Sequence, residues 1–356
     1  MRLCGLVAIL LVAVTGCTNA PDRAAVLQAA LDKIVADQAL ESGARGVTAS
    51  VITDQWTWSG AAGKDAVGTP LQPTTAMGVA SITKTFVAAE VMLLVKAGKV
   101  DLDAPISTYV KNKLTANGAT VRQHLSMTSG VPDYLGDDYA RLDTVIKAAP
   151  TKHWTPEQAL GYATAPVGPP GTFNYSNPSY VLLGLLIENV TGQPLATVLR
   201  RDLAAPAGLQ HAAFQDAEKP QPPAAQDINP VCGPPDGYLP CRAIASLSAA
   251  NAGLAADAPT IARWGAQLYF GHVLPPGLVA QMIAGDGRYG LGTMLFSRQF
   301  PPGLSYGHRG ESSDHNSLLL VFPDRHLVVA LLLAEGNKRV DDTMANFLTA
   351  LQPLLT

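Results

Sequence analysis

A serine and a lysine stand three residues apart in Ser81-Ile82-Thr83-Lys84, directly before an apolar run over residues 86–95. The run predicts a buried helix, which places the two side chains one turn apart on the same face. The hydroxyl and the amine can then share a hydrogen bond, and the free N–H groups at the helix start favour a developing oxyanion. Acyl transfer by a serine needs such a nucleophile, a base and oxyanion donors. Taken alone, the pair also fits a helix cap beside a surface lysine, which is the commoner arrangement.

A second motif is Tyr175-Ser176-Asn177. In an extended segment, residues two apart project to the same side, so Tyr175 and Asn177 can act together. A neighbouring ammonium such as Lys84 would favour the phenolate, which makes Tyr175 a candidate general base. Asn177 could bind the lysine or a substrate amide oxygen. The alternative is that Asn177 only caps the next helix and that Tyr175 packs nearby.

A third motif, His308-Arg309-Gly310, follows a strand-like run over residues 304–307. A glycine on an edge strand lets a substrate backbone approach closely, so an acyl chain could pair with the strand at Gly310. We expect His308 to be a donor that lines the cleft. A lone histidine beside a turn is otherwise an ordinary polar surface group.

The three motifs, in this order, resemble the serine β-lactamase and D-Ala-D-Ala carboxypeptidase (penicillin-binding-protein-like) superfamily, in particular the branch of class C β-lactamases and related esterases. The resemblance covers residues 46–336 and extends to the segments 78–86, 100–103, 124–131 and 289–292. It departs from the common pattern at residues 311–315, which are bulkier and more polar than the usual small, glycine-containing stretch. The chain also lacks the Ser-Asp-Asn and Lys-Thr-Gly sequences of class A β-lactamases.

The resemblance implies a role for each matching residue. It makes Ser81 the nucleophile, Lys84 and Tyr175 the proton-handling pair, and Asn177 a contact to substrate and lysine. His308 stands where many members have lysine, and Gly310 and Glu311 belong to the strand of the protein that would bind the substrate. The backbone N–H groups of Ser81 and Glu311 would form the oxyanion hole, and the family requires no metal or cofactor.

The N-terminus has the layout of an export signal. Arg2 precedes apolar or small residues from 3 to 14, and a glycine directly before Cys17 resembles a bacterial lipobox. We therefore expect a signal peptide over residues 1–16 and a lipidated Cys17 followed by a tether to residue 22. The chain would then be exported and lipid-anchored to the cell membrane on the extracytoplasmic side. An ordinary cleaved signal or a short signal anchor is the alternative.

Two further cysteines, Cys232 and Cys241, flank a loop rich in proline and glycine. In an oxidising exported compartment they are a plausible disulfide, whereas two free thiols remain the alternative.

The order of apolar runs predicts an α/β (α+β) fold, and the resemblance implies that it is of the β-lactamase/transpeptidase type. Residues 47–53 and 56–61 predict a hairpin, later strands are expected over 289–296, 316–322 and 327–334, and a closing helix over 340–354. Residues 23–100 and 255–356 would form an α/β domain with an antiparallel sheet flanked by helices. Residues 101–254 would be a mostly helical insertion, with the active site between the two parts. Two consecutive domains are the alternative.

Charge and hydropathy exclude some functions. The net charge of −3 is spread without a basic run, which argues against nucleic-acid binding. No segment after the signal has the length of a membrane span. We expect a monomeric serine hydrolase that acts through an acyl-enzyme on an amide, lactam or ester, as a β-lactamase or D-Ala-D-Ala carboxypeptidase does. A carboxylesterase of the same fold and a non-catalytic envelope-binding lipoprotein are the alternatives.

Overall fold

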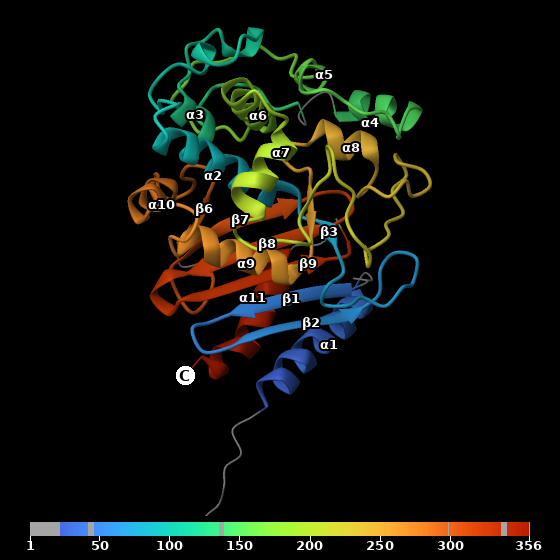
Figure 1. Cartoon of the computed structure of the whole chain (residues 1–356). Coiled ribbons are helices and arrows are strands. Elements are labelled where there is room, and N and C mark those ends of the chain that lie inside the picture. Colours follow the sequence, from blue (N-terminus) through green and yellow to red (C-terminus); the bar gives the residue numbers. More distant parts are fainter. Residues whose placement is uncertain (1–21, 42–45, 135–138, 298, 336–339, 356) are drawn as a thin grey trace, which may run out of the picture.

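The centre of the protein is a six-stranded antiparallel sheet with the strand order β2-β1-β9-β8-β7-β6 (Figure 1). The computed structural model describes residues 22–41, 46–134, 139–297, 299–335 and 340–355. The strands are β1 (Gly46–Ile52), β2 (Thr57–Gly63), β6 (Met294–Ser297), β7 (Ser305–Glu311), β8 (Asn316–Phe322) and β9 (Leu327–Leu333). The expected α/β fold with an antiparallel sheet is therefore confirmed.

The central strands are buried and mostly apolar because both faces of the sheet are covered. Successive side chains of a strand point to opposite faces, and in β9 Val329 and Leu331 join one core while Val328 and Ala330 join the other. Helices α1 (Arg23–Glu41) and α11 (Val340–Leu351) cover the first face, and α9 (Ala258–Tyr269) covers the second (Figure 1).

The predicted hairpin and the predicted late strands lie close to the expected positions. The β1–β2 turn is closed by Thr53, whose Oγ1 accepts from the N–H of Trp56 at 3.0 Å. The turn between β8 and β9 ends at His326 in the left-handed conformation, with a φ of 45°. The strand predicted over 289–296 is shorter than expected, because the chain turns at Gly292, with a φ of 72°, before β6 begins.

The closing helix also ends earlier than predicted. Helix α11 stops at Leu351, and residues 352–354 form a 3₁₀ turn that contains Pro353. A proline inside a helix removes a backbone hydrogen bond and clashes with the preceding turn, which explains the early end.

Helix α2 (Thr83–Lys96) is buried between layers, as its apolar sequence predicts; Phe86, Val87 and Val91 have no exposed surface. It follows the 3₁₀ turn η1 (Ala80–Ile82) directly. The turn is preceded by β3 (Met77–Gly78), which belongs to a small second sheet of order β3-β5-β4 with β4 (Ala213–Phe214) and β5 (Leu254–Ala256). The turn η1 is therefore anchored by β3 of the second sheet on its N-terminal side and by the buried helix α2 on its C-terminal side.

The middle of the chain is mostly helix and loop, and it gathers on the α2 side of the sheet (Figure 1). Its helices are α3 (Val121–Leu125), α4 (Tyr139–Ala148), α5 (Pro156–Leu160), α6 (Asn177–Thr191), α7 (Leu195–Leu199) and α8 (Arg242–Leu247), with short turns at Ile106–Thr108, Lys113–Thr115 and Arg200–Ala204. Helix α10 (Pro276–Ile283) follows α9. The division of the chain at residues 101 and 254 stays a prediction.

The predicted signal peptide and Cys17 lie outside the described residues. Within the described part of the chain, no single helix has the length and apolar character to cross a membrane. Helix α6 and the segment Leu195–Ala204 reach that length only together, and they meet at an angle of 78°.

Candidate active site

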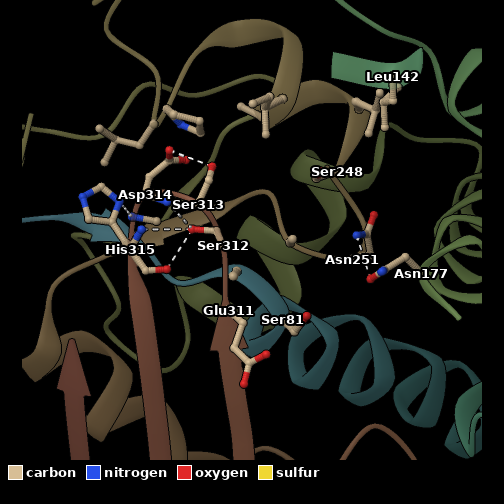
Figure 2. A pocket seen from close by; sticks show the side chains of 18 of the residues that line it. Ser81, Leu142, Asn177, Ser248, Asn251, Glu311, Ser312, Ser313, Asp314 and His315 are labelled. Carbon is tan, nitrogen blue, oxygen red and sulfur yellow. Dashed lines mark hydrogen bonds between the residues drawn. The ribbon is translucent and has the colours of Figure 1, made fainter. Parts of the chain in front are cut away.

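A pocket of about 420 Å³ opens at the junction of η1, β7 and the helices α4, α6 and α8 (Figure 2). Ser81, Tyr175, Asn177 and Glu311 all line it, so four of the predicted site residues share one cavity. The remaining wall comes from the proline-rich loop before α8 and from the turn after β7, through Leu239, Pro240, Asp314 and His315.

Ser81 lies at a tight bend that the surrounding structure enforces. Ala80 just before it has a positive φ of 44°, a conformation that is costly for a residue with a side chain. The Ser317 hydroxyl donates to the carbonyl of Val79 at 2.8 Å, and Thr83 Oγ1 donates to the carbonyl of Ala80 at 2.7 Å. These contacts hold the bend and present Ser81, partly exposed, at the floor of the pocket.

Lys84 is fully buried directly beneath Ser81. Its Nζ lies 2.8 Å from Ser81 Oγ, 2.8 Å from Asn177 Oδ1 and 2.9 Å from the carbonyl oxygen of Asn251. Burial lowers the pKa of Lys84 to about 7, although the negative charge of Asp133 opposes the shift. The lysine therefore exchanges its proton near neutral pH.

The three neighbours of Lys84 match a neutral amine. A neutral amine has two hydrogens and one lone pair. The carbonyl oxygens of Asn177 and Asn251 can only accept, so they take the two hydrogens, and the lone pair is left for the Ser81 hydroxyl. In this state the Ser81 O–H donates to Lys84, which is the geometry that proton abstraction requires.

Two residues that the sequence motifs did not indicate orient this network. The Nδ2 of Asn177 donates to the Asp133 carboxylate at 3.1 Å, and its Oδ1 accepts from Asn251 Nδ2 at 3.1 Å. The Tyr134 hydroxyl in turn donates to Asn251 Oδ1 at 3.0 Å. Neither Asp133 nor Asn251 belongs to a recognisable motif, so only the fold could reveal them.

Tyr175 reaches Ser81, but the electrostatics of the phenol differ from the expectation. Burial raises the pKa of Tyr175 well above its usual value; a hydrogen bond with Ser81 opposes the rise, and the charges of Asp133 and Glu311 add to it. The Lys84 nitrogen lies 4.9 Å from the centre of the ring. The expected phenolate is therefore not favoured, because loss of solvent outweighs the nearby lysine, and Tyr175 is a protonated phenol at neutral pH.

His308 also corrects an expectation, because it lies beneath the pocket and does not line it. The side chain is fully buried. Its Nδ1 faces the carbonyl of Arg309 at 2.6 Å and must donate to it, so Nε2 accepts from the Tyr289 hydroxyl at 2.9 Å. Burial and the nearby Lys84 lower the pKa of His308 to about 3. His308 is therefore neutral, and its role is to accept a hydrogen bond from Tyr289.

Gly310 is required by the protein's own backbone more than by a substrate. A Cβ at this position would lie 2.2 Å from the carbonyl oxygen of Val79 and 2.2 Å from Ser317 Oγ. Strand β7 therefore passes in close contact with the bend before Ser81. The next residue, Glu311, ends the strand beside the pocket.

Cys232 and Cys241 are joined by a disulfide with a Cα–Cα distance of 5.6 Å, and both side chains are buried. The bridge closes the loop that carries Leu239 and Pro240 to the pocket wall. Within the described residues, no group of three or more His, Cys, Asp or Glu side chains is arranged to hold a metal ion.

Comparison with known proteins agrees with this geometry. The Beta-lactamase family profile matches residues 27–353. A curated relative, Protein flp of Staphylococcus aureus strain N315, is 30% identical over 156 residues, which cover 40% of this chain and 29% of the relative. The match thus spans less than a third of that protein's length.

Two solved structures have the same fold over nearly their full length. The D-amino acid amidase from Ochrobactrum anthropi SV3 superposes with a TM-score of 0.79 at 22% identity, covering 94% of this chain and 99% of the amidase. The D-stereospecific amidohydrolase from Streptomyces sp. superposes with a TM-score of 0.74 at 25% identity, covering 93% and 98%. With a family match over almost its whole length and the Ser81, Lys84 and Tyr175 side chains gathered at one pocket, this chain belongs to the Beta-lactamase family.

Proposed function

We propose that the protein is a serine acyl-transfer hydrolase that forms an acyl-enzyme on Ser81 with an amide, lactam or ester substrate. One observation carries the proposal: the Nζ of Lys84 lies 2.8 Å from Ser81 Oγ. Because the pKa of Lys84 is lowered to about 7, the amine is available as a base at neutral pH.

The reaction has two halves. In the first, Ser81 Oγ forms a bond to the substrate carbonyl carbon while its proton passes to Lys84 Nζ. The bond to the leaving group then breaks, and the leaving amine or alcohol takes up a proton. In the second half, water adds to the acyl ester, and its proton returns through the same groups as Ser81 is released.

Tyr175 acts as the proton donor and relay of this mechanism. Its phenol hydrogen-bonds Ser81 and is protonated, so it can deliver a proton to the leaving group and recover one from Lys84. The backbone N–H groups of Ser81 and Glu311 are the proposed oxyanion donors. The close approach of β7 to the bend before Ser81 supports that pairing.

Amides are the first substrates to test, because the Streptomyces relative, 25% identical, is a D-stereospecific amidohydrolase. A carboxylesterase with the same residues and a non-catalytic binding protein remain the rival functions. The experiment is intact-mass analysis of residues 22–356 after exposure to a penicillin, a fluorophosphonate ester probe and a D-Ala-D-Ala peptide. We expect a covalent adduct that is absent in Ser81→Ala. No adduct with any of the three probes contradicts the proposal.

We further propose that the protein is exported and anchored by lipid at Cys17 on the extracytoplasmic side of the cell membrane. The signal-like residues 1–16 and the disulfide between Cys232 and Cys241 support an oxidising compartment. Metabolic labelling with a fatty-acid analogue should mark the full-length protein in the membrane fraction, and Cys17→Ser should lose the label. Label retained in Cys17→Ser would contradict the anchor.

The monomeric state likewise remains a proposal. Light scattering coupled to gel filtration of residues 22–356 should give the mass of one chain, and a larger mass that persists on dilution would refute it.

A further inference from the structure

Carboxylates line the pocket on several sides. They belong to Asp133, Asp143, Glu311 and Asp314. Two of them are committed to the protein: Asp133 accepts from Asn177, and Asp314 accepts from Asn229. Burial raises the pKa of Asp314 to about 7, so Asp133, Asp143 and Glu311 carry the full negative charges. Glu311 differs because its side chain is 70% exposed and is therefore accessible to a ligand (Figure 2).

The basic side chains of the described pocket wall do not balance these charges. Arg309 donates through Nε and through a second guanidinium nitrogen to the carboxylate of Asp341 on α11. The negative charge of Asp341 therefore offsets the positive charge of Arg309. The Nε of Arg309 lies 3.6 Å from Glu311 Oε1, a long contact to a carboxylate that is 70% exposed, so this pairing has little strength. Burial lowers the pKa of His315, so that residue is neutral.

The groups behind the nucleophile add little positive charge. His308 is buried and neutral, and Lys84, which is buried and has a pKa of about 7, carries only part of a positive charge at neutral pH. The negative charges reach the reacting atoms, because Asp133 and Glu311 both raise the pKa of Tyr175. A substrate carboxylate at Glu311 would meet a like charge, and an ammonium would meet an opposite one.

The opposite wall of the pocket is apolar. Leu142 and Ile146 of α4 face it together with Ile244 and Leu247 of α8, and Figure 2 shows Leu142 across the cavity from Glu311. A ligand that fills this space presents an apolar group to the helices and a charged or polar group to β7.

We propose that the pocket selects substrates that carry an apolar acyl side chain and an ammonium group on either the acyl side or the leaving-group side of the scissile carbonyl, and that Glu311 is the residue that determines this specificity. Substrates with a carboxylate at the same position are disfavoured. The inference rests on the proposed acyl transfer at Ser81. It also gives a role to the unusual polar segment that follows Gly310.

The test uses thioesters, because the released thiol is followed with a chromogenic thiol reagent. One series keeps a 3-phenylpropionyl group and varies the leaving thiol: mercaptoacetate, 2-mercaptoethanol or thiocholine. A second series keeps 2-mercaptoethanol and compares 3-phenylpropionyl with D- and L-phenylalanyl, which add an ammonium on the acyl side. Together they place a positive charge on either side of the carbonyl.

For the native protein we expect kcat/KM to be at least about tenfold higher for a cationic member of one series than for its neutral analogue, the scale of one charge-assisted contact. The mercaptoacetate thioester, which carries a carboxylate, should have the lowest kcat/KM of its series. The preference should shrink with added salt, since an exposed charge is screened. In Glu311→Gln the ratio of cationic to neutral substrate should fall towards one, and Glu311→Asp should restore part of it.

Asp324→Asn is the matched control, because it removes one carboxylate at an exposed turn between β8 and β9, outside the pocket wall. It should keep the native substrate ratio. The inference is wrong if neither series favours the cation, or if Glu311→Gln keeps the preference. Labelling of Ser81 by fluorophosphonate is measured on the same samples, so loss of labelling marks a failure of the proposed reaction and not of the specificity.

Discussion

The amide nitrogen of Asn177 donates to the carboxylate of Asp133 at 3.1 Å, and this contact decides which way the amide faces. With the nitrogen held by Asp133, the Oδ1 of Asn177 must face Lys84 and accept from its Nζ at 2.8 Å. Asp133 therefore acts on Lys84, the proposed base, in two ways: it orients an acceptor, and its charge raises the pKa of Lys84.

Removal of Asp133 should change both the rate and its pH dependence. In the native protein, kcat/KM should rise as the pH increases through about 7, because Lys84 must lose its proton to act as a base. Asp133→Asn and Asp133→Ala both remove the charge that raises the pKa of Lys84, so the rise should move to lower pH. Asp133→Ala, which also frees the Asn177 amide, should lose about tenfold more activity. A rise that stays at the native pH in both variants would contradict this role.

The identity of the base can be tested at Tyr175. Because burial keeps the phenol protonated, Tyr175→Phe should lower kcat by about 100-fold or more and leave the acidic side of the pH profile in place. Steady-state rates between pH 5 and pH 9 measure both. If the rise near pH 7 disappears in Tyr175→Phe, the titrating group is the phenol and Lys84 is not the base.

Gly310 should tolerate no side chain. In Gly310→Ala the new Cβ would collide with the Val79 carbonyl, so β7 must move away from the bend that carries Ser81. We expect a loss of about 1–3 kcal/mol in the free energy of unfolding and a larger loss of kcat than of substrate binding. Gly303→Ala is the control, since a Cβ there has open space. Equal behaviour of the two variants in denaturant titration and kinetics would refute the steric argument.

The disulfide should stabilise the loop that forms part of the pocket wall. Its cysteines are separated by nine positions in the sequence. A closed loop of this size is worth about 2.5 kcal/mol through the unfolded chain. Replacing both Cys232 and Cys241 by serine should lower the free energy of unfolding by roughly that amount and raise KM, because Leu239 and Pro240 would lose their restraint. An unchanged thermal midpoint would contradict the stabilisation, and an unchanged KM would contradict the restraint of the pocket wall.

Several features follow from the sequence alone. The run over residues 86–95, apolar except for Glu90, predicts the buried helix α2, and short β-rich runs predict the early hairpin and the late strands. The order of three short motifs indicates the family, which the match over residues 27–353 confirms. These patterns lie within short segments or in the order of segments along the chain, so they can be recognised without knowledge of the fold. The limits of β6 and α11 were less well predicted because a glycine turn and a proline shorten those elements.

The chemistry of the site depends on what the tertiary structure places around each group. The charge of a nearby ammonium, considered alone, favours the phenolate of Tyr175, whereas burial keeps Tyr175 a phenol and lowers the pKa of Lys84 to about 7. The sequence shows His308 as a polar residue beside a turn, yet the fold buries it under Tyr289. Asp133 and Asn251 come to Lys84 from distant segments without any motif. Residue types and spacing thus indicated the family and the candidate nucleophile, but protonation states and partners were decided by solvent exclusion and long-range contacts, which no local pattern encodes.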